Sequence, residues 1–314
     1  MQEQDMLAAA TMYYVQDEKM ETIAGQLGVS RSTVSRLLQR ARQSGMVQVT
    51  ISDPARHSSH ISEAFRRMFS VTAHVVQVRD SASDVQRLDQ VARVAGRLLS
   101  SHVTDNATIG VAWGTTVAAI TNHLVPRPSA GITVVGLNGA ANPVTSGIPY
   151  VGSIYSQFAE AFGGTVVHFP VPAFFDYAST KEAMWRERSI QHVLAIRRQC
   201  DVALFGVGGI DSPLQSHVYA SSYLDERDFA KIRAEKVVGD VCTVLLREDG
   251  TFADISVNAR ATGLSPSELR RIPRRICAVA GVAKAAAVLG ALRARAATDL
   301  VIDEATAKAV LDRT

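Results

Sequence analysis

The first strong pattern along the chain is an amphipathic helix over residues 31–42. Its apolar positions follow the 3.6-residue period of one buried helical face: Val34, Leu37, Leu38 and Ala41. The opposite face is polar and basic and carries no acid. Ser30 can cap the first turn with its hydroxyl, and Gly45 can take the left-handed conformation past the last turn. The sequence therefore predicts a helix with defined ends and one basic, solvent-exposed face.

A shorter helix is predicted just before it, over residues 20–27. Gly28 and Val29 then provide a tight turn and an apolar plug between the two helices. A helix over about residues 5–15 packs across both, and residues 46–51 alternate apolar and polar positions like a strand or wing. This order is typical of a helix-turn-helix domain.

The polar face of the predicted recognition helix has side chains of the types that commonly contact DNA. Short hydroxyls approach base edges and phosphates, and arginines make forked contacts to guanine or phosphate. If only the charge pattern is considered, an ordinary surface helix with a solvated basic face is as plausible as a DNA-binding helix. The paired helix, the glycine turn and the wing favour DNA binding. The predicted DNA-contacting residues are Ser30, Arg31, Ser32, Thr33, Ser35, Arg36, Gln39 and Arg40.

The rest of the chain alternates short apolar strands with helices. Strands are predicted over residues 73–78, 107–113, 132–137, 165–170, 202–206, 276–280 and 300–302. Helices are predicted over residues 85–103, 180–200 and 283–296 and at the end of the chain. A hairpin is predicted to join residues 240–246 and 253–257 around residues 248–250. Continuous apolar strands between helices favour an α/β domain with a mainly parallel, doubly wound sheet.

The predicted domains are residues 1–53, a linker over residues 54–60, and residues 61–314, which begin with a short amphipathic helix. The net charge is only +3, so a DNA-binding charge must be local. The cysteines, Cys200, Cys242 and Cys277, lie far apart without metal-binding or disulfide spacing. The sequence shows no secretion signal and no apolar run long enough to span a membrane. We expect a cytoplasmic protein without a cofactor, a metal or a membrane partner.

Three loops are placed to bind a ligand, because ligands of such sheets bind beyond the carboxyl ends of the strands. Gly114, Thr115 and Thr116 follow a strand and begin a helix, where free N–H groups favour an anion. Residues 206–211, including Gly208, form another predicted glycine turn. Its glycines could allow a ligand to approach closely, but tight packing explains them equally well. Lys284 lies in the first turn of an apolar helix, where a cation opposes the helix dipole and an anionic ligand would explain it. A snorkelling lysine is the alternative.

Two further polar residues lie near predicted strand ends. Asp240 enters a strand after a glycine and could bind sugar hydroxyls or cap a turn. Asn138 follows a strand and could also bind a sugar hydroxyl or belong to a turn. The turn is possible because Asn-Gly is an ordinary turn pair. Both are retained as candidate effector-binding residues.

Five phrases together resemble the SorC/DeoR-type family of bacterial sugar-sensing transcriptional regulators. They are residues 23–38, 110–116, 238–242, 279–284 and 300–307. The resemblance implies an effector domain akin to sugar-phosphate isomerases and deaminases, and a phosphorylated sugar or polyol as effector. It also implies a homo-oligomer, a dimer or tetramer, on double-stranded operator DNA. The family's effector contacts fall on the Gly114–Thr116 loop, Asp240 and Lys284.

The chain departs from the family pattern at two places. A family member has a lysine where this chain has Asn138, and that lysine can form a Schiff base with the effector. An asparagine cannot capture an effector in this way. Residues 281–282 read Gly-Val where family members often have two glycines, which predicts a tighter loop.

The main alternative function is a sugar-phosphate isomerase or deaminase with an attached DNA-binding domain. No convincing acid/base pair lies near the glycine loops, and a fold does not carry an activity. A dinucleotide-binding sensor is a third interpretation. It is disfavoured because the glycines of residues 206–209 lack the required fingerprint.

Overall fold

The computed structural model describes residues 2–47, 60–79, 81–213, 216–220 and 222–314. Its contacts divide the chain into two compact units, Met1–His57 and Ser58–Thr314, and each has its own core. Of the predicted linker, only His60 lies within the described residues, where it begins a helix. None of the helices in the described ranges has both the length and the apolar character needed to cross a membrane.

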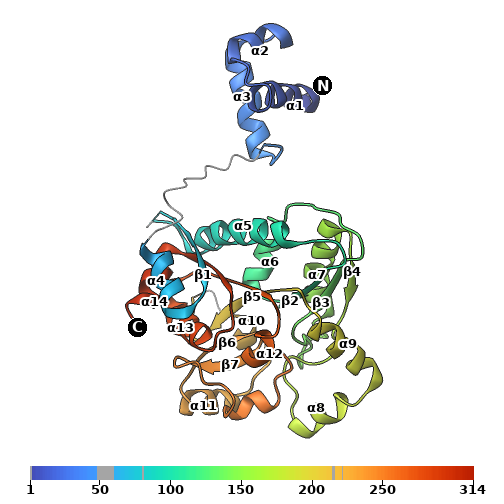
Figure 1. Ribbon diagram of the computed structural model, residues 1–314, viewed down its shortest axis with the longest axis vertical. Helices are drawn as coiled ribbons and strands as arrows, with labels where there is room; N and C mark the ends of the chain where they lie inside the picture. The colour runs from blue at the N-terminus through green and yellow to red at the C-terminus, as the bar shows by residue number, and fades with distance from the viewer. Residues whose placement is uncertain (1, 48–59, 80, 214–215, 221) are drawn as a thin grey trace. The chain divides into compact units, whose positions relative to one another are not determined.

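The first unit contains three helices, labelled in Figure 1 as α1 (Gln2–Tyr14), α2 (Met20–Leu27) and α3 (Arg31–Gln43). Gly28 ends α2 in the left-handed conformation, with φ +65°. Ser30 caps α3 by accepting a hydrogen bond from the Thr33 backbone N–H at 3.2 Å. The core combines residues from all three helices: Ala9, Ala10, Ile23, Val34, Leu37, Leu38 and Ala41. The predicted turn, cap and apolar face of the recognition helix are confirmed.

The predicted strand over residues 46–51 is wrong for residues 46 and 47, the two positions that the structure describes. Met46 and Val47 form no strand and pack, partly buried, against the core of this unit. The Val47 N–H donates to the Ala41 carbonyl at 2.9 Å, so the chain folds back onto the end of α3. Residues 48–51 lie outside the described residues.

The second unit is built on a mainly parallel sheet, as predicted. Its main path runs β1-β9-β8-β5-β2-β3-β4, and all the pairs along it are parallel. The strands on this path are β1 (Thr72–Val76), β2 (Thr108–Val111), β3 (Thr133–Gly136), β4 (Thr165–Val167), β5 (Val202–Gly209), β8 (Arg274–Val279) and β9 (Asp299–Asp303). β6 (Val237–Val241) pairs antiparallel with the end of β5, and β7 (Val244–Arg247) with β6.

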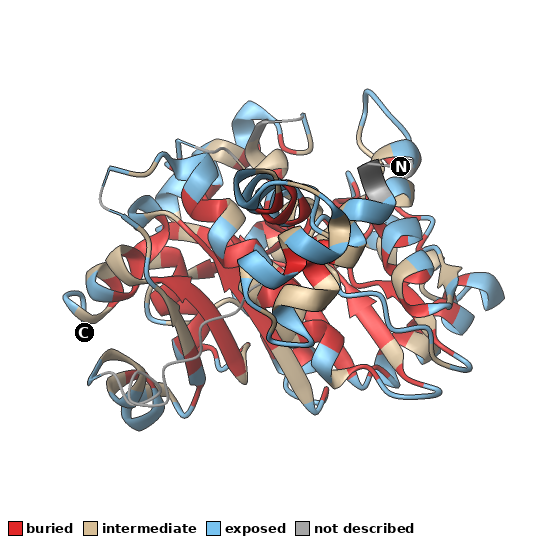
Figure 2. Ribbon diagram, turned by 90° about the horizontal axis from the view of Figure 1, so that it is seen from above, coloured by how far each residue is buried: buried red, intermediate tan, exposed pale blue. Residues whose placement is uncertain are grey.

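Helices cover both faces of this sheet, and each face has its own apolar core. One core contains residues of α5 (Asp84–His102), α6 (Thr115–Thr121) and α7 (Ile148–Phe162). The other contains residues of α4 (His60–Phe69), α9 (Arg188–Arg198), α13 (Ala285–Arg293) and α14 (Glu304–Leu311). Successive strand residues alternate between the two cores, which explains why the strands are continuously apolar. Figure 2 accordingly shows buried residues along most of the strands.

The predicted helix over residues 180–200 is two helices, α8 (Ala178–Met184) and α9. The break lies at Trp185, whose ring packs edge-on against Phe169 and Phe175, with centroid distances of 5.7 and 6.0 Å. Both phenylalanines lie in the segment before α8, outside the predicted helix, so the helical period alone does not indicate the break. The sequence also gave no prediction for α7, for α10 (His217–Ala220) or for α11 (Glu226–Ala234).

The predicted hairpin is also misplaced. β6 and β7 form the hairpin by themselves, connected by the two residues Cys242 and Thr243. Residues 253–257 lie in turns and enter a short 3₁₀ helix, η2 (Ser256–Ala259). Two-residue hairpin turns usually contain Asn-Gly or Asp-Gly. The pair Cys-Thr is not typical of such a turn, so the sequence did not indicate a turn at this position. The remaining short elements are α12 (Pro266–Leu269) and η3 (Val282–Lys284).

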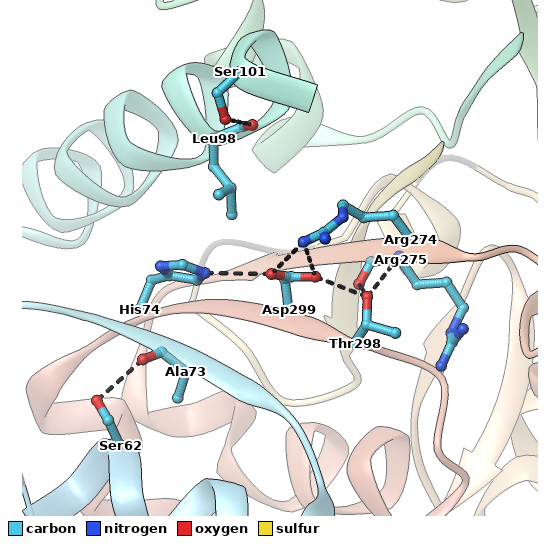
Figure 3. A network of polar contacts seen from close by, with 9 residues as sticks. All are labelled: Ser62, Ala73, His74, Leu98, Ser101, Arg274, Arg275, Thr298 and Asp299. Atoms are coloured by element: carbon cyan, nitrogen blue, oxygen red, sulfur yellow. Dashed lines mark hydrogen bonds and ion pairs between the residues drawn. The ribbon is translucent and has the colours of Figure 1, made fainter. Parts of the chain in front are cut away.

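A polar network closes the amino-terminal ends of β1, β8 and β9 (Figure 3). Both carboxylate oxygens of Asp299 accept from the Arg274 guanidinium at 3.1 Å, and the Thr298 hydroxyl donates at 2.8 Å. His74 lies 3.4 Å from the same carboxylate. Burial alone would raise the pKa of Asp299, but these hydrogen bonds and the charge of Arg274 outweigh it and lower the pKa. The network thus stabilises a charged Asp299 at this end of the sheet.

Candidate DNA-binding surface and effector pocket

The candidate DNA-binding surface is the polar face of α3. Of the predicted contact residues, Thr33 is half-buried, and the rest are exposed: Ser30, Arg31, Ser32, Ser35, Arg36, Gln39 and Arg40. Their exposure follows from the helical period that buries Val34, Leu37, Leu38 and Ala41. The face therefore presents arginines and short hydroxyls without a carboxylate of its own helix.

Two contacts on this surface were not foreseen from the sequence. Arg31 pairs with Glu21 of α2 at 3.2 Å, and both side chains are largely exposed. Such an exposed pair contributes little to stability. The Ser30 hydroxyl contacts the hydroxyls of Ser32 at 2.8 Å and Thr33 at 2.9 Å, in addition to its capping bond. Ser30 therefore has a structural role in starting α3.

The candidate effector pocket lies in the second unit, at the carboxyl ends of the parallel strands. Parallel strands end at the same edge of a sheet, so loops far apart in sequence meet there. All of the predicted effector-binding residues line this one pocket: Gly114, Thr115, Thr116, Asn138, Gly208, Asp240 and Lys284. Their convergence is a finding of the structure, and their role in binding stays a prediction.

Three glycines make room for the polar groups of the pocket. A Cβ at Gly208 would lie 2.0 Å from an Asp240 carboxylate oxygen, and a Cβ at Gly209 would lie 3.2 Å from the Lys284 side chain. A Cβ at Gly239 would lie 2.1 Å from the Gly208 carbonyl oxygen. The predicted glycine turn over residues 206–211 is wrong for residues 206–209, which belong to β5. These glycines allow β5, β6 and α13 to pack closely around the pocket.

Asp240 is a buried carboxylate with two internal hydrogen bonds. It accepts from the Tyr219 hydroxyl at 3.0 Å and from the Thr243 backbone N–H at 3.0 Å. Burial raises the pKa of Asp240 to about 6, although these bonds and the charge of Lys284 act in the opposite direction. Asp240 thus caps the β6–β7 turn, as one of the two predicted roles requires. It also lines the pocket, and its binding of sugar hydroxyls stays a prediction.

Lys284 is buried, with a relative exposure of 7%, so the snorkelling alternative is wrong. It is the last residue of η3 and precedes α13, rather than lying in the first turn of an α-helix as predicted. Burial lowers the pKa of Lys284, and the carboxylate of Asp240 partly offsets this effect. Its ammonium has no hydrogen bond or ion pair with any residue that the structure describes. The side chain is buried, but its ammonium is not among the fully enclosed polar atoms, so it can bind an anionic group of a ligand in the pocket.

Asn138 is the second group in the pocket without an internal partner. Its side chain is only 2% exposed, and neither its amide nitrogen nor its amide oxygen has a hydrogen bond within the described chain. Buried polar atoms are nearly always paired, so each exception requires an explanation. A ligand hydroxyl can satisfy both atoms, because it donates and accepts.

The Gly114–Thr116 loop forms another wall of the pocket. Gly114 has φ +149° and precedes α6, and Thr116 is buried whereas Thr115 is exposed. Trp113, just before this loop, donates its indole N–H to the Gly139 carbonyl at 2.8 Å and stacks on Tyr223. The lining of the pocket thus offers partners for an anionic group and for several hydroxyls. Within the described ranges, no group of histidines, cysteines and acids is placed to bind a metal.

Some lining residues were missed at the sequence level. Cys242, Thr243, Ser216, Val218 and Trp113 line the pocket but were not among the candidates. Trp113 could have been found from its place beside Gly114. The others occupy an unrecognised hairpin turn and a short segment without a periodic pattern. All three cysteines are buried and free, as expected.

Comparisons with known proteins agree with both parts of this description. Residues 53–312 match the family described as "Putative sugar-binding domain", and residues 9–44 match sigma-70, region 4. The chain is 30% identical to the deoxyribonucleoside regulator of Bacillus subtilis, over 98% of this chain and 96% of that protein. It is 24% identical to the sorbitol operon regulator of Klebsiella pneumoniae, over 96% of each chain.

Solved structures give the same picture. A domain of a possible sugar-binding transcriptional regulator from Arthrobacter aurescens is 44% identical, with a TM-score of 0.76 over 84% of this chain and all of that one. The full-length sorbitol operon regulator of Klebsiella pneumoniae is 22% identical, with a TM-score of 0.79 over 98% of this chain and 97% of that one. The second likeness shows a shared fold.

Proposed function

This chain belongs to the SorC/DeoR family of sugar-binding transcriptional regulators, and we propose that a phosphorylated sugar or polyol in its pocket controls operator binding. Its relatives are transcriptional regulators rather than enzymes, which argues against the isomerase or deaminase alternative. The proposal concerns the finer chemistry of regulation: which group of the effector is recognised, and by which residues.

The observation that carries the phosphate proposal is Lys284, a buried lysine that lines the pocket. A buried charge costs several kcal/mol unless it is paired, and Lys284 has no hydrogen-bond partner among the described residues. Asp240 lowers this cost only through space. A phosphate would supply the missing charge-assisted hydrogen bonds, and the N–H groups after Gly114 would add donors.

Recognition of the sugar hydroxyls is assigned to Asn138 and Asp240. The unpaired amide of Asn138 offers a donor and an acceptor, and the carboxylate of Asp240 retains lone pairs beyond its two internal bonds. Because residue 138 is an asparagine, this recognition is non-covalent. An effector without an aldehyde, such as a polyol phosphate, is therefore as acceptable as an aldose phosphate.

Calorimetric titration of the full chain tests the phosphate proposal. We define a sugar-phosphate panel of 2-deoxyribose 5-phosphate, ribose 5-phosphate, glucose 6-phosphate and sorbitol 6-phosphate, each paired with its unphosphorylated parent. The first and last compounds reflect the named regulators that the chain resembles. We expect one or more of the phosphorylated compounds to bind about tenfold more tightly, or better, than the unphosphorylated parent. A tenfold difference is about the effect of one charge-assisted hydrogen bond. Equal affinity within every pair would contradict the phosphate proposal.

We propose that the chain binds double-stranded operator DNA as a dimer or tetramer. Helix-turn-helix proteins commonly read two half-sites, whose spacing mirrors the symmetry of the protein. An effector that prefers one assembly or conformation would shift the population able to hold both half-sites. The proposed division is a DNA-binding domain over residues 1–53, a linker over 54–60, and an effector and oligomerisation domain over 61–314.

A fragment beginning at residue 60 tests this division. It retains the whole sheet and the pocket, so we expect it to fold, oligomerise and bind the panel compounds like the full chain. It should not shift operator DNA in a gel, since α3 is absent. Sedimentation and titration of the fragment beside the full chain provide the measurement. A soluble fragment that cannot bind a ligand of the full chain would refute the division.

A further inference from the structure

The turn between β6 and β7 holds two residues in a backbone conformation that they rarely adopt. Cys242 has φ +50° and Thr243 has φ +66°, as a two-residue hairpin of the mirror-image type requires. Thr243 is the one β-branched residue with positive φ in the described ranges, and such a residue is a genuine outlier in this region. Residues held in such conformations cluster at ligand-binding sites.

The side chains of this turn contribute little to the fold through hydrogen bonds. The Thr243 hydroxyl donates to the carbonyl of its neighbour Cys242, within the turn itself. The capping bond to Asp240 uses the Thr243 backbone N–H, which any residue but proline would provide. A glycine at position 243 would keep the turn and remove the strain. Packing in the interior accounts for the burial of the Thr243 side chain, but contact with a ligand is a further reason for keeping a strained residue here.

The pocket supplies that reason. Cys242 and Thr243 line it together with Asp240 and Lys284, and both are almost fully buried, with relative exposures of 4% and 1%. The turn thus forms the wall beside the two charged groups that we assign to the effector.

A rigid segment fixes the position of this wall. A Cβ at Gly263 would fall 1.5 Å from the Cys242 carbonyl oxygen, so the turn packs directly on this glycine. The neighbouring Thr262 hydroxyl accepts from the Gly139 N–H at 3.1 Å. Buried Arg197 donates to the carbonyls of both Leu137 and Thr262. The strained turn and Asn138 are therefore held at a fixed spacing across the pocket.

We propose that Thr243 is a specificity-determining residue of the effector pocket, kept in a strained conformation because its side chain contacts the bound sugar phosphate. This inference rests on the proposed function above. The Thr243 methyl group and hydroxyl select among sugars that share the anionic group, and Lys284 and Asp240 bind the features common to them. Affinity and selectivity are then separable properties of the pocket.

The test compares full-length Thr243→Gly with wild type in two measurements. Thermal unfolding without ligand should show a Tm within about 2 °C of wild type, because relief of the positive-φ strain offsets the loss of the buried Thr243 contacts. Titration with the sugar-phosphate panel should show a roughly three- to tenfold loss of affinity for the best ligand. A loss of this size corresponds to roughly one lost contact. The ratio between the best and second-best ligand should fall as well. Thr243→Ser, which keeps the hydroxyl, should retain more of this ratio.

Lys236→Gly is the matched control. Lys236 also has positive φ, at +55°, but is exposed and lies outside the pocket lining. It should gain stability without a change in ligand affinity or selectivity. A folded Thr243→Gly protein that binds the panel with the affinity and selectivity of wild type would overturn the inference. A wild-type protein that binds no panel compound would instead overturn the proposed function.

Discussion

Replacing Arg31 and Arg36 together with alanine is expected to abolish specific operator binding. Each arginine that reads a base contributes about 1–3 kcal/mol, so the double variant should lose roughly 30- to 20,000-fold in affinity if the losses add. Both side chains are exposed on α3, and the pair between Arg31 and Glu21 lies on the surface. Removal of these side chains should therefore leave the helix folded, because the apolar face of α3 forms the core.

The measurement is a gel-shift titration on duplexes that the wild-type protein selects from random DNA. Arg270→Ala with Arg271→Ala removes the same charge from exposed positions in the second unit and should leave the affinity unchanged. Arg40→Ala with Arg42→Ala should weaken binding to all sequences and reduce its salt dependence, as expected for phosphate contacts. Unchanged operator affinity of the Arg31 and Arg36 variant would show that α3 is not the recognition helix.

The recognition helix could be predicted because its determinants are local. The period of its buried residues, the Ser30 cap and the Gly28 turn all lie within about 20 residues of each other, and the structure has each of them. The same holds for the alternation of strands and helices in the second unit. The pocket was predictable for a topological reason, since parallel strands bring their following loops to one edge whatever the sequence separation.

The failures have non-local causes. The break between α8 and α9 depends on Trp185 packing against two phenylalanines from another segment. The glycines of residues 206–209 looked like a turn, but they allow β6 and Lys284 to approach β5. The hairpin turn carries Cys-Thr, which has no intrinsic preference for it, because packing on Gly263 and the bond to Asp240 hold it. In each case, tertiary contacts override local preference.

The burial of Lys284 has the largest consequence for function. Sequence alone left a snorkelling lysine and an anion-binding lysine equally plausible. The packing of β5, β6 and α13 argues against the first, and anion binding stays a prediction. The same packing buries Asp240 and raises its pKa to about 6. Two opposite charges thus face one pocket without a direct ion pair within the described chain. This arrangement suits a ligand that brings its own negative charge and several hydroxyls.

Lys284→Ala is expected to abolish the effect of the ligand on DNA binding while leaving operator affinity nearly intact. The lost charge-assisted hydrogen bond should reduce affinity for the best panel phosphate by about ten- to a hundredfold. Affinity for the unphosphorylated parent should change little, so the preference for the phosphate should vanish. Operator affinity should persist because α3 belongs to the other unit, with its own core.

Lys181→Ala is the control for this experiment. Lys181 is another lysine whose pKa is lowered by burial, but it donates to the Ala259 carbonyl at 3.2 Å and does not line the effector pocket. Its replacement should leave both the phosphate preference and the ligand response unchanged. Calorimetric titration and gel shifts with and without ligand measure the two properties on all three proteins. If Lys284→Ala still discriminates the phosphate from its parent, the anion is bound elsewhere in the pocket, and the Gly114–Thr116 loop becomes the leading site.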